Sequence, residues 1–133
     1  ILVDGWCLGA TAQTDEDLAS PINALEAQLD KDAVWRKEVN ANLAGAYQLT
    51  FARLDAIVCL QAPSFEIVHA WRCEQEESLL ARPLADGDKI RIATFIQHFE
   101  RITRHMIAGG RRADIDVQLD EHRNVAEIRH RAG

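Results

Sequence analysis

The acid–glycine pair at residues 4 and 5 is the first place where the sequence could support chemistry. An apolar run, Ile1–Val3, leads into Asp4, and Gly5 permits a sharp turn directly afterwards. In enzymes that transfer phosphate from nucleotides, an acid at the end of a buried strand holds the magnesium ion, directly or through water. Strands also end in Asp-Gly simply because the pair suits a turn, so both interpretations stay open.

A second candidate is Arg72, within the polar segment WRCEQE at residues 71–76. Helical spacing places Arg72, Gln75 and Glu76 on one face of a helix. The functional interpretation is a mobile lid that offers a guanidinium group to a phosphate in transfer. The simpler interpretation is an exposed Arg–Glu pair at i and i+4, which stabilises a helix by a few tenths of a kcal/mol. Spacing alone favours the simpler one.

The segment from residue 101 to residue 112 carries five basic residues and no acidic one, and it is a candidate anion site. Cations near the end of a helix followed by a solvated loop would give the same pattern, and this explanation is favoured. His98 and His105 lie seven residues apart without an obvious third ligand, so a metal site there is not expected. The basic residues are Arg101, Arg104, His105, Arg111 and Arg112.

Several chemical signatures are absent from the sequence. It contains no GxxxxGKS/T phosphate loop, no GxSxG, no HExxH and no GxGxxG. Its three cysteines, Cys7, Cys59 and Cys73, are far apart and form neither CxxC nor a zinc-binding spacing, which favours a reduced, cytoplasmic location.

The elements that must position these residues alternate between strand and helix. Residues 1–4 and 54–60 are apolar and predict buried strands, and 114–119 with 125–129 alternate as in a hairpin. Residues 10–22 are expected to be a loop. Helices are expected over about 24–31 with Asn23 as cap, 34–53, 65–81 with Ser64 as cap, and 89–107 with Asp88 as cap. This order predicts one α/β domain over residues 1–133, with a mostly parallel sheet flanked by helices.

Charge and composition narrow the classes of partner. The 133 residues carry a net charge of −6, and all of it arises within residues 1–32. A globally acidic chain argues against nucleic acid as the main partner. No apolar run approaches the roughly 20 residues of a membrane-spanning helix, so no membrane partner is expected.

Together these motifs resemble the D-glycerate 3-kinase-like P-loop kinases, relatives of uridine kinase, phosphoribulokinase and pantothenate kinase. The resemblance is to the downstream part of that family and spans nearly the whole chain. It rests most on Asp-Gly-Trp at 4–6 with Leu-Gly at 8–9, Val-Asn at 39–40, and WRCEQE at 71–76, with further likeness at FIQHFERITRH (95–105) and RADIDVQLDEHRNV (112–125).

The resemblance implies a partial P-loop NTPase-type three-layer fold with a helical lid over about 65–82 and a C-terminal hairpin. It implies transfer of the ATP γ-phosphate, with Mg²⁺, to a hydroxyl of a small, glycerate-like metabolite. Asp4 then corresponds to the acid near the metal, where many relatives have Glu. The resemblance also implies roles for other residues. Acceptor contacts are implied for Trp6, Asn40 and Tyr47, and nucleotide or lid contacts for Arg72, Gln75, Arg101 and Arg104.

The phosphate-binding loop of that family lies upstream of the segment that begins here. We therefore expect the 133 residues alone to be inactive, with a longer chain supplying the loop. The alternative is a non-catalytic α/β module for interaction or dimerisation. We also expect a free sheet edge beside residues 1–4, through which two copies could form a homodimer.

Overall fold

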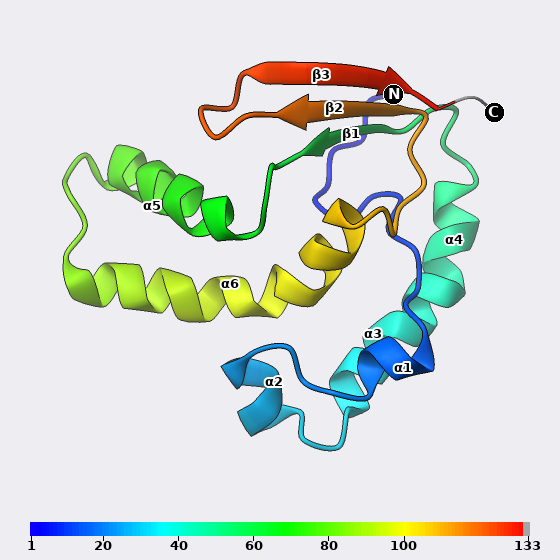
Figure 1. Cartoon of the computed structure of the whole chain (residues 1–133), viewed down its shortest axis with the longest axis horizontal. Coiled ribbons are helices and arrows are strands. Elements are labelled where there is room, and N and C mark those ends of the chain that lie inside the picture. The colour runs from blue at the N-terminus through cyan, green and yellow to red at the C-terminus, as the bar shows by residue number, and fades with distance from the viewer. Residues whose placement is uncertain (132–133) are drawn as a thin grey trace.

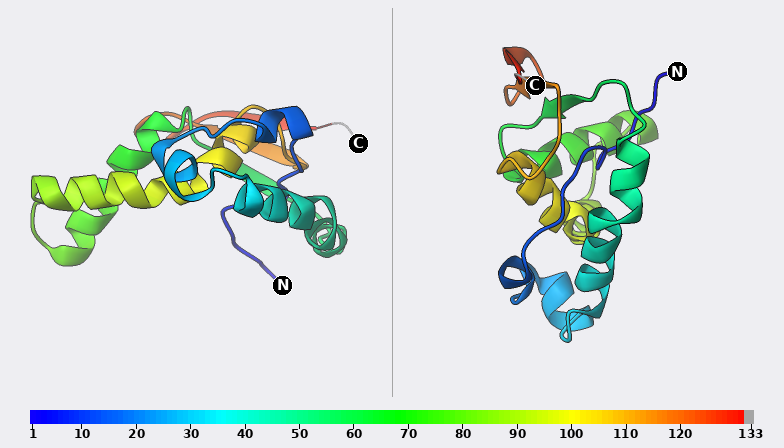
Figure 2. Two further views of the ribbon diagram at one scale, coloured as in Figure 1. Left: turned by 90° about the horizontal axis from the view of Figure 1, so that it is seen from below. Right: turned by 90° about the vertical axis from the view of Figure 1, so that its right-hand side faces the viewer.

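The computed structural model describes residues 1–131 as three strands and six helices (Figure 1). In Figure 1 the strands form the upper part and most of the helical residues lie below them, and the right-hand view of Figure 2 again has the hairpin at the top. The elements are α1 (Asp15–Leu18), α2 (Ala24–Leu29), α3 (Val34–Ala44), α4 (Ala46–Phe51), β1 (Val58–Gln61), α5 (Glu66–Leu80), α6 (Asp86–Ile107), β2 (Ile115–Leu119) and β3 (Val125–His130).

The sheet has the order β1-β2-β3 and is mixed. β1 runs parallel to β2, whereas β2 and β3 pair antiparallel as the expected hairpin, with a bulge between Gln118 and Leu119. The α/β class and the terminal hairpin are therefore confirmed. The sheet is less parallel than expected, because only one of its two pairings is parallel.

The expected strand at residues 1–4 is not formed. Ile1, Leu2 and Val3 are exposed, and no strand within residues 1–131 pairs with them. A strand exists only through hydrogen bonds to a neighbour, so an apolar sequence alone does not produce one.

The helices differ from the prediction in two places, one at Gly45 and one at Thr14. The single helix expected over 34–53 is two helices, because Gly45 adopts φ −113° and ψ −97° and breaks the ladder. The expected loop over 10–22 contains α1, where the Thr14 side chain accepts a hydrogen bond from the backbone of Asp17. Asn23 caps α2 as predicted, by accepting from the amide of Glu26.

Two predicted caps are wrong. α5 begins after Phe65 without a side-chain cap, so Ser64 is not its N-cap. α6 begins after Ala85, and Asp88 stands in its first turn, where its carboxylate accepts from the Ala85 amide. The amphipathic pattern of α6 is as expected and buries Ile96 and Met106.

A small core joins the loop after Gly9 to α3 and α6. Ala10, Leu43 and Met106 are buried together, with Cys7, Ala12 and Ile102 packed beside them. Gly9 has φ +83° and a side chain there would meet the Arg112 carbonyl, so glycine is required at this crossing. No helix within residues 1–131 is long and apolar enough to cross a membrane.

Candidate functional site

Asp4 lies on an open groove between the N-terminal segment and β1. The groove has a volume of about 890 Å³ and is lined by residues 1–6 on one side and residues 53–60 on the other. Two further charged side chains, Arg53 and Asp55, line the same groove. The sequence analysis missed both, because nothing in their spacing distinguishes them from ordinary loop residues.

Trp6 connects this groove to the long helix α6. Its ring meets the ring of Phe99 edge-on, with centroids 5.1 Å apart, and Phe99 meets Phe95 in the same way at 5.1 Å. The guanidinium carbon of Arg72 lies 6.0 Å from the centre of the Phe95 ring. A line of aromatic contacts therefore runs from the Asp4 loop to Arg72, and edge-to-face pairs hold such rings in defined positions.

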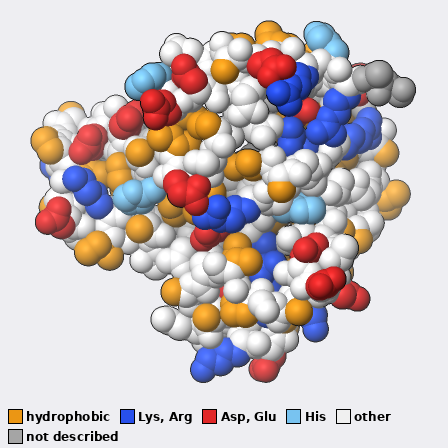
Figure 3. Space-filling model, in the orientation of Figure 1, with side chains coloured by type: hydrophobic (Ala, Val, Ile, Leu, Met, Phe, Trp, Pro, Cys, Tyr) orange, Lys and Arg blue, Asp and Glu red, His pale blue; other side chains and the backbone are white. Residues whose placement is uncertain are grey.

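Arg72 projects from α5 and is partly exposed. It donates to Gln75 over 2.8 Å and pairs with Glu76 over 2.6 Å, as helical spacing predicts. It lines two shallow grooves along α5, one of about 520 Å³ with Trp71 and one of about 290 Å³ facing α6. Acidic, basic and hydrophobic side chains are interspersed over the face of the molecule in Figure 3.

A set of contacts ties α5 to the turn between β2 and β3. In Figure 1, α5 and this turn lie next to each other. The Trp71 indole N–H donates to the Glu121 carbonyl over 2.9 Å, and Arg123 pairs with Glu74 over 2.5 Å. The Arg123 guanidinium also lies over the Trp71 ring at 5.2 Å. We call these contacts the α5–turn latch. No sequence pattern predicted it, because its partners lie about 50 residues apart.

Asn40 and Tyr47 line none of the grooves described above. The Asn40 amide accepts from the Gln13 amide over 2.7 Å and donates to the Gln13 carbonyl over 3.0 Å, which fixes the loop before α1. Tyr47 is exposed on α4, with its ring 5.8 Å from that of Phe51. The structure does not bring these two residues together with Trp6, so their role as acceptor contacts stays a prediction.

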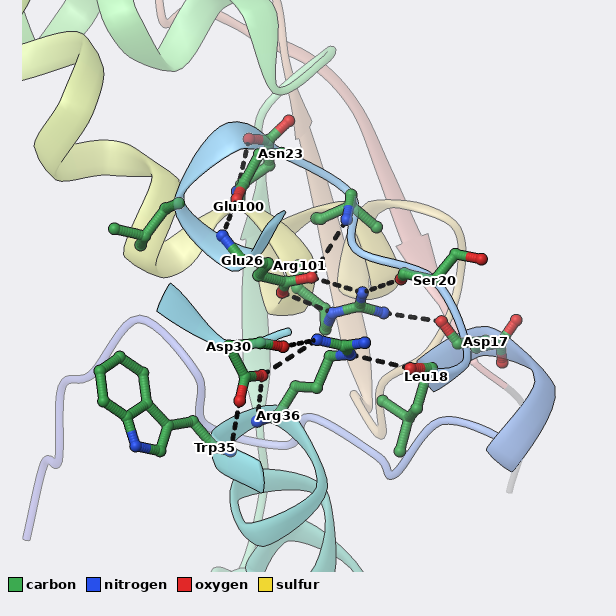
Figure 4. Close-up of polar contacts among 12 residues, drawn as sticks. Asp17, Leu18, Ser20, Asn23, Glu26, Asp30, Trp35, Arg36, Glu100 and Arg101 are labelled. Carbon is green, nitrogen blue, oxygen red and sulfur yellow. Dashed lines mark hydrogen bonds and ion pairs between the residues drawn. The ribbon is translucent and has the colours of Figure 1, made fainter. Parts of the chain in front are cut away.

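Arg101 is committed to internal contacts (Figure 4). Its guanidinium grips the Glu26 carboxylate with two bonds of 2.7 Å and donates to the Asp17 and Ser20 carbonyls, each over 2.8 Å. Only 8% of the residue is exposed. Burial alone would raise the pKa of Glu26, but hydrogen bonds from Arg101 and the Ile22 amide outweigh it and lower the pKa. Arg101 therefore anchors α2 to α6.

A second buried arginine, Arg36, fixes the same part of the chain. Arg36 pairs with Asp30 over 3.1 Å and donates to the Leu18 carbonyl over 2.8 Å (Figure 4). Burial would raise the pKa of Asp30, but the amides of Trp35 and Arg36 donate to its carboxylate and lower the pKa. The two arginines pair with two of the seven acids of residues 1–32, Asp30 and Glu26, so this part of the acidic charge is paired internally.

Arg104, three residues beyond Arg101, lies on the surface instead. It pairs with Glu66 over 2.6 Å and Glu100 over 2.9 Å, and its guanidinium lies 4.8 Å from the Phe65 ring centre. Glu66 opens α5, so Arg104 links α6 to the start of α5.

One carboxylate, Asp4, is the candidate metal ligand. Within residues 1–131, no three His, Cys, Asp or Glu side chains are grouped so that they could hold a metal ion. A magnesium ion that arrives with a nucleotide takes one or two protein carboxylates and completes its shell with phosphates and water. Asp4 fits that role as a single ligand.

Comparison with known proteins shows which proteins share this fold. No family model matches the chain. It is 28% identical over 105 residues to the uncharacterized kinase mug58 of Schizosaccharomyces pombe, a match that covers 74% of this chain and 35% of that protein. D-glycerate 3-kinase from Cryptococcus neoformans var. grubii superposes with a TM-score of 0.67 at 16% identity, over 95% of this chain and 48% of that one.

A second solved structure agrees. The YGR205w protein superposes with a TM-score of 0.57 at 14% identity, over 97% of this chain and 46% of that chain. The chain thus shares its α/β fold with D-glycerate 3-kinase, and the resemblance is confirmed at the level of the fold. It spans about half the length of the solved structures and about a third of the curated relative that it matches.

Proposed function

We propose that this chain carries the lid and the metal-side acid of an ATP-dependent kinase that phosphorylates a hydroxyl of a small, glycerate-like metabolite in the cytoplasm. The observation that carries the proposal is the continuous contact from the Asp4 loop through Trp6, Phe99 and Phe95 to Arg72. It connects, through one line of contacts, the two parts of the chain to which we assign roles in phosphotransfer. The kinase fold of D-glycerate 3-kinase supports the same conclusion.

Each residue has a separate part in the proposed reaction. Mg²⁺-ATP, when bound, supplies the phosphoryl group and neutralises part of its charge. Asp4 would hold the metal through its one carboxylate, directly or through water. The Arg72 guanidinium can bond two phosphate oxygens at once. To do so, it would give up its present contacts with Gln75 and Glu76. Trp6 forms one wall of the groove that would receive the acceptor.

The chain by itself is proposed to be inactive. Phosphoryl transfer depends on backbone amides and a lysine that cradle the β- and γ-phosphates, and the sequence contains no GxxxxGKS/T segment. Arg101 is removed from the expected nucleotide contacts, because its guanidinium already has four internal bonds. Two candidates remain: Gln75 in the middle of α5, and Arg104 on α6, which pairs with Glu66 at the start of α5.

The alternative proposal is a non-catalytic α/β module for interaction or dimerisation. The exposed apolar residues of β1 favour it, since Val58 and Leu60 are 55% and 67% exposed. Both proposals require that something cover β1, and only the kinase proposal requires Asp4 and Arg72.

The two proposals are separated by a chimera in which this chain replaces the matching part of the Cryptococcus neoformans D-glycerate 3-kinase. Transfer of ³²P from γ-labelled ATP to D-glycerate is measured for the chimera, for Asp4→Asn and for Arg72→Ala. We expect each variant to lose at least about 100-fold in kcat, as removal of a charge-stabilising group does. Arg129→Ala on β3, an exposed arginine paired with Glu127, is the matched control and keeps the rate. Equal rates in all four proteins would refute the assigned roles.

A further inference from the structure

Helix α5 carries Arg72 but contributes no buried side chain to the core. None of its residues, Glu66–Leu80, is buried. A helix with so few buried contacts has low local stability, and its own hydrogen bonds do not fix how it lies against its neighbours. The position of α5 therefore depends on a few polar contacts along its sides. Arg72 depends on them most, because a contact with a phosphate in transfer requires a defined position.

Contacts on two sides of α5 fix its rotation about its own axis. On one side, the His69 imidazole donates to the Lys89 carbonyl of α6 over 3.1 Å. By helical geometry Trp71 and Glu74 lie nearly opposite His69, and the α5–turn latch holds both of them. Arg72 lies between the two sides, since it lines a groove on each. Loss of the latch would leave one side of α5 unattached and would move Arg72.

Arg123, the centre of the latch, has an unusual backbone conformation. The turn from β2 to β3 is a three-residue loop (121–123), in which the Arg123 amide donates to the Asp120 carbonyl and the Asp120 amide to the Asn124 carbonyl. The last residue of such a loop is left-handed, a conformation that favours glycine. Here it is an arginine at φ +64°. The two other non-glycine residues with positive φ among residues 1–131 are alanines at helix ends.

The contacts of Arg123 do little for stability. In its ion pair with Glu74, 47% and 60% of the two side chains are exposed, and exposed pairs stabilise a fold only weakly. The left-handed backbone is itself unfavourable for any residue with a Cβ atom. Strained residues of this kind cluster at functional sites. The effect of the guanidinium is instead one of position, because it holds Glu74 and lies over the Trp71 ring at 5.2 Å.

From these observations we infer that Arg123 is a positioning residue for Arg72. By holding Trp71 and Glu74, it fixes the rotation of α5 and thereby the position from which Arg72 would reach the phosphates. The inference rests on the proposed function for the role of Arg72. Arg123 itself contacts no reacting atom, so its whole effect on phosphate transfer passes through Arg72.

The test uses Arg123→Gly, which suits the left-handed backbone and removes the guanidinium. In the D-glycerate 3-kinase chimera, phosphate transfer is measured for Arg123→Gly, for Arg72→Ala and for the double variant. Arg123→Lys is the conservative variant, since its ammonium group can still pair with Glu74. Arg129→Ala is the matched control, because Arg129 also makes an exposed ion pair, on β3. Differential scanning calorimetry gives the Tm of each protein.

We expect Arg123→Gly to lower kcat about 10- to 100-fold, with KM for D-glycerate unchanged and Tm within about 3 °C. The double variant should be no slower than Arg72→Ala, because both changes remove the same contact. Arg123→Lys should restore most of the rate, and Arg129→Ala should keep all of it. Unchanged kcat in Arg123→Gly would overturn the inference. So would losses that multiply in the double variant, because Arg123 would then act independently of Arg72.

A second measurement on the 133-residue chain does not depend on catalysis. The Arg72 guanidinium carbon lies 6.0 Å from the centre of the Phe95 ring, so the ring current shifts the NMR signals of the Arg72 side chain relative to those in Phe95→Leu. We expect Arg123→Gly to abolish this shift and Arg129→Ala to keep it. A shift that persists in Arg123→Gly would overturn the inference. Loss of the shift together with a chimera that transfers no phosphate would count against the proposed function alone.

Discussion

Replacement of Arg101 by alanine tests whether this arginine stabilises the fold or contacts a nucleotide. The change leaves the Glu26 carboxylate and the Asp17 and Ser20 carbonyls without the partner they have now. Removing one member of a buried ion pair costs about 3–5 kcal/mol, because the other charge stays buried and unpaired. The Arg101 side chain is 9% exposed and that of Glu26 13%, so this buried range applies.

This loss of unfolding free energy corresponds to a large decrease in Tm. The entropy of unfolding of 133 residues is about 0.28 kcal/mol/K, so a loss of about 3–5 kcal/mol lowers Tm by roughly 10–18 °C. Differential scanning calorimetry measures the shift directly. Arg104→Ala is the matched control, since Arg104 also pairs with two glutamates on the same helix but is 45% exposed. Its Tm should fall by no more than about 3 °C.

The reasoning would be refuted if Arg101→Ala melted within about 3 °C of the unaltered chain. If that stable variant also abolished phosphate transfer in the chimera, Arg101 would be a nucleotide contact, as the family resemblance implies. A large loss of Tm together with the small effect of Arg104→Ala would establish burial as the deciding difference.

Three further predictions follow from the fold. The pKa values of Glu26 and Asp30 are lower in the folded chain than in the unfolded chain, where they are about 4.5 and 3.8, so both carboxylates stabilise the fold at higher pH. The urea concentration at the unfolding midpoint should therefore fall as the pH drops from 5 to 3, and a midpoint that does not change with pH would contradict this. Gly9→Ala should cost at least twice as much stability as Gly109→Ala, since both have positive φ but only Gly9 faces a carbonyl; equal losses in chemical denaturation would contradict it. Arg123→Ala should release the α5–turn latch and speed amide exchange in α5 at least several-fold, measured by mass spectrometry, and unchanged exchange would refute the latch.

Local patterns were sufficient for some elements. The terminal hairpin follows from two alternating segments around a polar turn, and α6 follows from apolar residues at three- and four-residue spacing. The cap at Asn23 depends on residues 23–26 alone and was predicted correctly. In each case the information lies within one element.

Long-range contacts decided the rest. Arg101 and Arg104 are the same residue type on one helix, and the segment from α1 to α2, which packs against Arg101, makes the first buried while the second stays exposed. The apolar residues 1–3 form no strand, because a strand depends on a neighbour that local sequence does not specify. Arg123 reaches Trp71 and Glu74 across about 50 residues, so no spacing could have indicated the latch.

The most direct test of the central claim compares glycerate-dependent ADP formation by the chain alone with that by the chimera carrying the rest of the Cryptococcus neoformans kinase. The account predicts no turnover by the chain alone and D-glycerate-dependent turnover by the chimera. Turnover by the chain alone would contradict the claim that it needs a phosphate-binding partner. A folded chimera that binds ATP but transfers no phosphate would contradict the kinase assignment and leave the interaction module as the function.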